Sequence, residues 1–145
     1  HANRALGTLK YEPAAQVLGK QILHTETVDG MPMFTYIGPA RKSAIWALGQ
    51  IGTDQALKTL QRLVGLEDPL DRYENLKTAC SGLVKNEFSP AAETLKNAAG
   101  GDLPAPKLRW LFAQAYAAIT GKDLGIDRPE QTPAYSSFLL QEAED

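Results

Sequence analysis

The chain has 145 residues, 43% of them hydrophobic and 22% charged, and a formal net charge of −2. These values are ordinary for a globular domain and exclude a disordered tail, a collagen-like fibre and a disulfide-stapled mini-protein. The apolar residues include 20 Ala and 19 Leu but only 4 Val and 6 Ile. Because Ala and Leu favour helices and β-branched residues favour strands, the composition predicts an all-α protein.

The charges are unevenly distributed along the chain. Residues 1–122 hold 14 Lys and Arg against 11 Asp and Glu, whereas residues 123–145 hold one Arg against six acidic residues. A body with a net charge of +3 lacks the dense positive face that duplex DNA binding requires, so no nucleic-acid partner is expected. The acidic end is interpreted as a solvated terminal segment.

The first residues resemble neither a native start nor a leader. The chain opens at His1 without Met or a signal-peptide pattern, and the helical pattern is already present at Ala5. We expect a fragment of a longer chain, with His1 as the remnant of a tag. The compartment, cytoplasmic or periplasmic, stays open, and no apolar stretch is long enough for membrane insertion.

An internal repeat organises the sequence. The pattern of residues 5–22 recurs without a gap at residues 47–64, a weaker third copy follows from Gly82, and a fourth half-copy ends near Gly121. In the third copy Asn86 and Glu87 replace the Ile and Gly of the second. Each copy predicts two helices, A and B, and only stacked neighbours bury both apolar stripes, which is the logic of an α-solenoid.

Residues 44–60, AIWALGQIGTDQALKTL, resemble a bacterial HEAT repeat of the phycobilisome-lyase type. In that family an A helix ending in Ala-Leu-Gly-x-Ile-Gly leads through a short turn into a B helix. The resemblance covers roughly residues 2–121 and implies an α-solenoid of about three to four helical hairpins. It implies little about function, because the family is defined by packing positions.

One domain is expected over residues 1–145, with two departures from the repeat. Asp29-Gly30 between β-forming residues predicts a short hairpin-like insertion, and Thr132-Pro133 predicts the start of a C-terminal capping helix. The side chains expected to close the solenoid end are Tyr135, Phe138 and Leu139. The expected segments are 1–24 (truncated repeat 1), 25–38 (insertion), 39–66 (repeat 2), 69–100 (repeat 3), 105–121 (half repeat) and 122–145 (loop and capping helix).

The residues that could carry catalysis are few. His24 stands at the expected end of the first B helix, where it suits the last carbonyls. Cys80 could pair with His24 as a nucleophile, but its place on an apolar stripe favours a buried, inert thiol. Core packing is likewise favoured over a ligand role for Trp46 and Trp110. We therefore expect no enzyme and no cofactor.

One pair of carboxylates is a candidate metal site. Asp123 and Asp127 could hold a cation together with backbone carbonyls, but the segment lacks the loop pattern of a calcium site. No metal is therefore predicted.

The expected binding surface is the B-helix face, which is concave in HEAT-like stacks. Aligning the copies places Gly19, Gln61 and Lys96 at one outward position. Four outward residues would form a modestly basic stripe: Lys20, Lys58, Arg62 and Lys96. The stripe is either an ordinary solvated face or a groove for an acidic peptide or protein segment.

The insertion is the second candidate surface. Met31, Met33, Phe34 and Tyr36 give it four large side chains within six residues. They either contact a partner or fold back over the adjoining helices.

Three functions remain open. The favoured one is a non-catalytic scaffold or adaptor that binds another protein. The alternative is an assembly or lyase-type accessory factor that acts with another subunit. A HEAT-like DNA-binding protein of the alkylpurine glycosylase kind is disfavoured by the weak positive charge.

Overall fold

The computed structural model describes residues 12–28, 31–34, 38–66, 73–101 and 106–129, and these residues are mostly helical. Their elements, in chain order, are α2 (Glu12–Leu23), β1 (Thr25–Val28), β2 (Met31–Phe34), α3 (Gly38–Ile51), α4 (Asp54–Val64), α5 (Tyr73–Lys85), the 3-10 turn η1 (Ser89–Ala91), α6 (Ala92–Gly100) and α7 (Pro106–Thr120). The predicted capping helix, with Tyr135, Phe138 and Leu139, lies outside the described residues.

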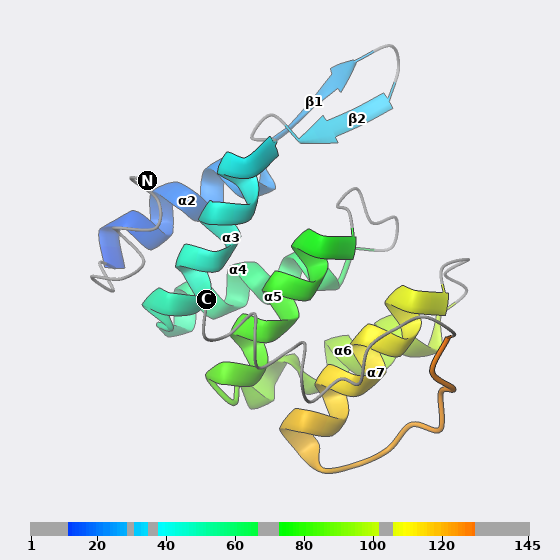
Figure 1. Ribbon diagram of the computed structural model, residues 1–145. Helices are drawn as coiled ribbons and strands as arrows, with labels where there is room; N and C mark the ends of the chain where they lie inside the picture. Colours follow the sequence, from blue (N-terminus) through cyan, green and yellow to red (C-terminus); the bar gives the residue numbers. More distant parts are fainter. Residues whose placement is uncertain (1–11, 29–30, 35–37, 67–72, 102–105, 130–145) are drawn as a thin grey trace.

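The helices form two layers (Figure 1). The A layer consists of α3, α5 and α7, in which α5 contacts both of its neighbours. The B layer consists of α2, α4 and α6, with α4 in contact with the other two. Contacts between α3 and α4, α4 and α5, and α6 and α7 join the layers, so consecutive helices alternate between them. The arrangement agrees with an all-α, HEAT-like fold.

The apolar stripes of the repeat meet between the layers. Leu48 on α3, Leu60 on α4 and Leu83 on α5 are all completely buried. The predicted core role of the tryptophans holds: Trp110 is 3% exposed, and Trp46 is half-buried against the same cluster. One continuous core therefore underlies both layers.

The helices α3 and α5 approach each other closely through two glycines. A Cβ atom placed on Gly82 would lie 3.0 Å from the Cα of Gly49 and 2.8 Å from the Cδ1 of Leu60. Next to this crossing, Asn86 Nδ2 donates to the carbonyl oxygens of Gly49, at 2.9 Å, and of Gly82, at 2.8 Å. The side chain that replaces the repeat's Ile thus ties the two helices together.

All three A-layer helices end in left-handed backbone. The residues concerned are Gly52, Glu87 and Gly121, with φ angles of 66°, 48° and 76°. Such a residue after the last helical turn lets the chain reverse direction, and glycine adopts it without steric cost. The conformation recurs at equivalent repeat positions even where the glycine has been lost.

Two short strands lie within residues 25–38. The strands β1 and β2 pair antiparallel, with Thr25 opposite Phe34 and Val28 opposite Met31. Figure 1 shows both strands extending away from the helical layers. Pro32 is compatible with this ribbon because each strand of a two-stranded sheet has a free edge.

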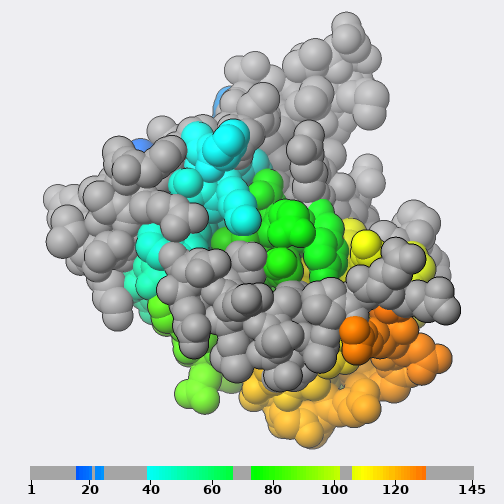
Figure 2. Space-filling model, in the orientation of Figure 1, coloured from blue at the N-terminus to red at the C-terminus, as the bar shows by residue number. Residues whose placement is uncertain are grey.

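Figure 2 shows the face formed by the A layer. Parts of α3, α5 and α7 appear on it in order, followed by the segment after α7. The B layer lies behind them in this view, so its outer surface faces the opposite side of the molecule.

Candidate functional site

The three helices of the B layer carry the four predicted cations. Lys58 and Arg62 lie one helical turn apart on α4, and both are exposed. The other sides of α4 are buried against the A layer and the neighbouring B helices, so these two residues face away from the core. Lys20 on α2 and Lys96 on α6 are also exposed. We call these four residues the basic row.

Acidic neighbours reduce the charge of this face. Lys58 Nζ lies 2.8 Å from Asp54 Oδ2, an i,i+4 pair in which both side chains are about two-thirds exposed, at 64% and 68%. Glu93, also exposed, stands on α6 close to Lys96 in sequence. Lys20, Arg62 and Lys96 make no ion pair with any other described residue. The basic row is therefore modestly positive, and Lys58 contributes least to it.

Two residues of one aligned position, Gly19 and Gln61, do not face outward, contrary to the prediction. Gly19 is buried, and a Cβ there would lie 3.0 Å from Thr59 Oγ1 on α4. Gln61 is half-buried, and its Nε2 donates to Thr94 Oγ1 at 2.9 Å and to the Pro90 carbonyl at 3.3 Å. The reason is that B helices pack side by side, which turns the flanking positions toward neighbouring helices rather than solvent.

The insertion is described only as backbone. Met31, Met33 and Phe34 lie on β2, and Tyr36 lies outside the described residues. Whether they contact a partner or cover the helices stays a prediction.

Beyond Lys96, the surface is hollowed between the end of α6, α7 and the segment that follows α7. The hollow has a volume of about 440 Å³. The described residues that line it are Lys96, Asn97, Gly100, Arg109, Leu124 and Ile126. Cationic groups and aliphatic side chains thus share one depression at the edge of the basic row.

Arg109 is fixed at the hollow by the end of α6. Its Nε donates to the carbonyl of Ala99 at 3.0 Å, which satisfies one of the carbonyls left free at a helix C-terminus. Arg41 acts in the same way at α2, where its buried Nη1 donates to the Ile22 carbonyl at 2.7 Å. The repeat pattern of the sequence does not predict either contact, because each arginine caps a helix that precedes its own.

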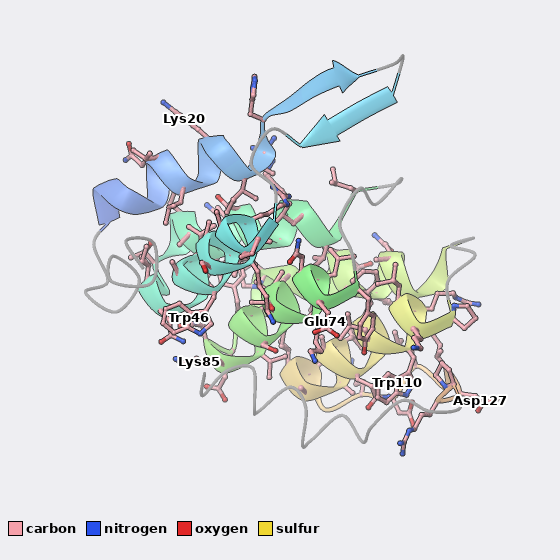
Figure 3. The ribbon with its side chains drawn as sticks, turned by 45° about the horizontal axis from the view of Figure 1, so that its top comes forward. Lys20, Trp46, Glu74, Lys85, Trp110 and Asp127 are labelled. Carbon is pink, nitrogen blue, oxygen red and sulfur yellow. The ribbon has the colours of Figure 1, made fainter. Side chains whose placement is uncertain are left out.

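The segment after α7 supplies the apolar wall. Gly125, with a φ of 74°, donates its N–H to Asp123 Oδ1 at 2.7 Å, which closes a tight turn around Leu124. Leu124 and Ile126 are half-buried against the core. In Figure 3, Asp127 and Lys20 are labelled at opposite ends of the molecule, so the hollow and the first residue of the basic row lie far apart.

Cys80 and His24 are the two residues that the sequence offers for catalysis. Cys80 is completely buried, and burial raises the pKa of its thiol far above the usual value, so the prediction of a buried thiol is confirmed. His24 is exposed just after α2.

Among the described residues, no group of three or more His, Cys, Asp and Glu side chains could hold a metal ion. No described helix is long and apolar enough to cross a membrane.

The family comparison concerns the centre of the chain. Residues 40–65 match the family model of the PBS lyase HEAT-like repeat. The chain carries a HEAT-like repeat. This repeat comprises most of α3 and all of α4, and it contributes Lys58 and Arg62 to the basic row. Comparisons with curated proteins and with solved structures gave no match.

Proposed function

We propose that this chain is a non-catalytic scaffold that binds an acidic segment of another protein. The observation that carries the proposal is the basic row: exposed cations on three neighbouring helices of one layer. We further propose that the two layers are a short α-solenoid, with the B layer on its concave side and the insertion at one edge.

The physical argument is electrostatic complementarity on a rigid support. The helices that present Lys20, Arg62 and Lys96 are anchored by a continuous core, so the backbone positions from which these side chains extend keep fixed spacings. A partner with matching carboxylates would be attracted before contact, which accelerates association more than it strengthens the final complex. The modest charge of the row suits a short acidic segment better than a polyanion.

A second candidate function follows from the matched family model, whose description is PBS lyase HEAT-like repeat. In this alternative the chain is an accessory factor that acts with a catalytic subunit. The two functions differ in the captured partner: an accessory factor would change the rate of a partner's lyase reaction, whereas a scaffold would not.

Charge reversal tests the basic row. The double variant Lys58→Glu with Arg62→Glu is compared with Lys107→Glu with Lys122→Glu, which makes the same charge change at exposed positions outside the B layer. Association with a partner captured by the unmodified chain is then measured over a range of salt concentrations. We expect the B-layer variant to associate about tenfold more slowly and with less salt dependence, while the control stays close to the parent.

An equal loss in both variants would show a non-specific charge effect, and no loss in either would remove the basic row from the binding surface. Circular dichroism of both variants checks that the helices remain intact.

The insertion is tested separately by Phe34→Ala with Tyr36→Ala. Aromatic side chains at an interface act mainly on dissociation, so this variant should dissociate faster at a nearly unchanged association rate. Unchanged dissociation would assign these side chains to covering the helices.

A further inference from the structure

The hollow at the end of the B layer combines two kinds of lining. Its lining includes the cationic residues Lys96 and Arg109 and the aliphatic residues Leu124 and Ile126. Its volume of about 440 Å³ falls within the range of small-ligand sites. The lining therefore fits a group that is anionic at one end and aliphatic at the other.

Arg109 is well prepared to receive an anion. Its Nε bond to the Ala99 carbonyl, at 3.0 Å, fixes the guanidinium, and its two Nη atoms make no hydrogen bond to any described residue. A fixed, planar guanidinium binds carboxylates with less loss of side-chain entropy than a free one. The contact that caps α6 thus also orients a binding group.

The surrounding charges favour a singly charged anion. Lys96 and Arg109 supply two positive charges, opposed by the C-terminal end of α6, which carries roughly half a negative charge. Exposed Asp123 and Asp127 flank the apolar wall in sequence and would repel a dianion such as phosphate. One carboxylate is therefore a better match than a phosphate group.

We propose that the hollow binds the free C-terminal carboxylate of a partner chain whose last residue is aliphatic. The carboxylate contacts Arg109 and Lys96, and the last side chain packs on Leu124 and Ile126. This inference rests on the proposed scaffold function and identifies one part of the partner that the scaffold recognises. Because Lys96 belongs both to the basic row and to the hollow, one acidic chain end could occupy both surfaces.

Gly100 offers a variant that blocks the hollow without disturbing the fold. A Cβ placed on Gly100 meets no atom within 4 Å, so a larger side chain there enters open space. Gly100→Phe should fill the hollow, and Gly100→Ala is the matched control. Both replace a helical glycine, so neither is expected to destabilise α6.

The probe is a short N-acetylated peptide that ends in leucine with a free carboxylate, titrated into the 15N-labelled chain. We expect shift changes in the amides of Asn97, Gly100 and Ile126, with a Kd on the order of 1 mM. The amidated peptide and the Gly100→Phe variant should each weaken binding at least about tenfold. Gly100→Ala should bind the peptide as the parent does.

Equal binding of the acid and the amide, or unchanged binding by Gly100→Phe, would overturn the inference. Isocaproate alone binding as tightly as the peptide would also overturn it, because the hollow would then be a site for small carboxylic acids. Absence of peptide binding while the captured partner still depends on Lys58 and Arg62 would refute the hollow alone. If partner binding does not depend on Lys58 and Arg62 while the peptide still binds, the proposed function of the basic row fails instead.

Discussion

Glu87 adopts a backbone conformation that its repeat equivalents, Gly52 and Gly121, reach without strain. Its φ of 48° follows the last turn of α5, where the N–H of Phe88 donates to the Leu83 carbonyl at 3.0 Å. A side chain in left-handed backbone costs about 1–2 kcal/mol, so this position stores strain that the glycines avoid. The repeat alignment shows that Glu87 replaces a glycine, but only the structure shows that the backbone there keeps the left-handed conformation.

Glu87→Gly should therefore stabilise the protein. Removing the strain outweighs the greater flexibility of glycine in the unfolded chain, which leaves a net gain of about 0.5–1 kcal/mol in the free energy of unfolding. Urea denaturation measures the change. Gly52→Ala is the opposite control and should destabilise, since its φ is 66° and a Cβ there would lie 2.5 Å from Asn86 Oδ1. A destabilising Glu87→Gly would mean that the glutamate's contacts matter more than its backbone.

The thiol of Cys80 and the phenol of Tyr73 make the free energy of unfolding fall in alkaline solution. Burial raises the pKa of the Cys80 thiol above its ordinary value of 9.0, and burial, with smaller effects of Glu74 and Cys80, raises that of Tyr73 to about 12. Both groups bind their protons more tightly in the folded state, so this contribution is complete below the unfolded pKa and is lost as pH rises through the folded pKa.

We expect the urea midpoint to decline above about pH 9, and to decline less steeply in Cys80→Ala. Because Cys80 is completely buried, alkylation of its thiol at neutral pH should proceed only as fast as the protein opens. Rapid alkylation of the native protein would contradict the assigned burial.

At the scale of elements, sequence periodicity located the helices because each apolar stripe repeats at helical spacing. It also placed Lys58 and Arg62 on an outer face. It wrongly predicted that Gly19 faces outward, because the alignment of single helices does not show which side of each helix packs against the next one. It could not find the Arg109 cap, because that contact joins two helices whose relative placement depends on the whole fold.

The crossing of α3 and α5 gives a prediction for a pair of elements. Gly82→Ala would place a Cβ 2.8 Å from the Leu60 Cδ1 and 3.0 Å from the Gly49 Cα, so the helices must separate. We expect a loss of about 1–3 kcal/mol in the free energy of unfolding. Gly100→Ala, at an uncrowded helical glycine, should be neutral or stabilising. Equal effects of the two substitutions would show that helix propensity, not close packing, determines the change in the free energy of unfolding.

At the scale of the whole molecule, the proposed function assigns stability and recognition to different surfaces of the two layers. The packed surfaces between the layers hold the core, and the helices of the B layer carry the basic row, of which Lys96 also lines the hollow. Continuous packing from α3 through α7 means that a charge change on one helix leaves the spacing of the others unchanged. We therefore propose that the partner binds the surface of the B layer as a whole rather than any single residue.

Lysine acetylation footprinting tests this assignment most directly. The reactivity of each lysine is measured by mass spectrometry in the free chain and in complex with the captured partner. We expect protection of Lys20, Lys58 and Lys96, with unchanged reactivity at Lys107 and Lys122. Protection of Lys107 and Lys122, with the B-layer lysines as reactive as in the free chain, would contradict this assignment.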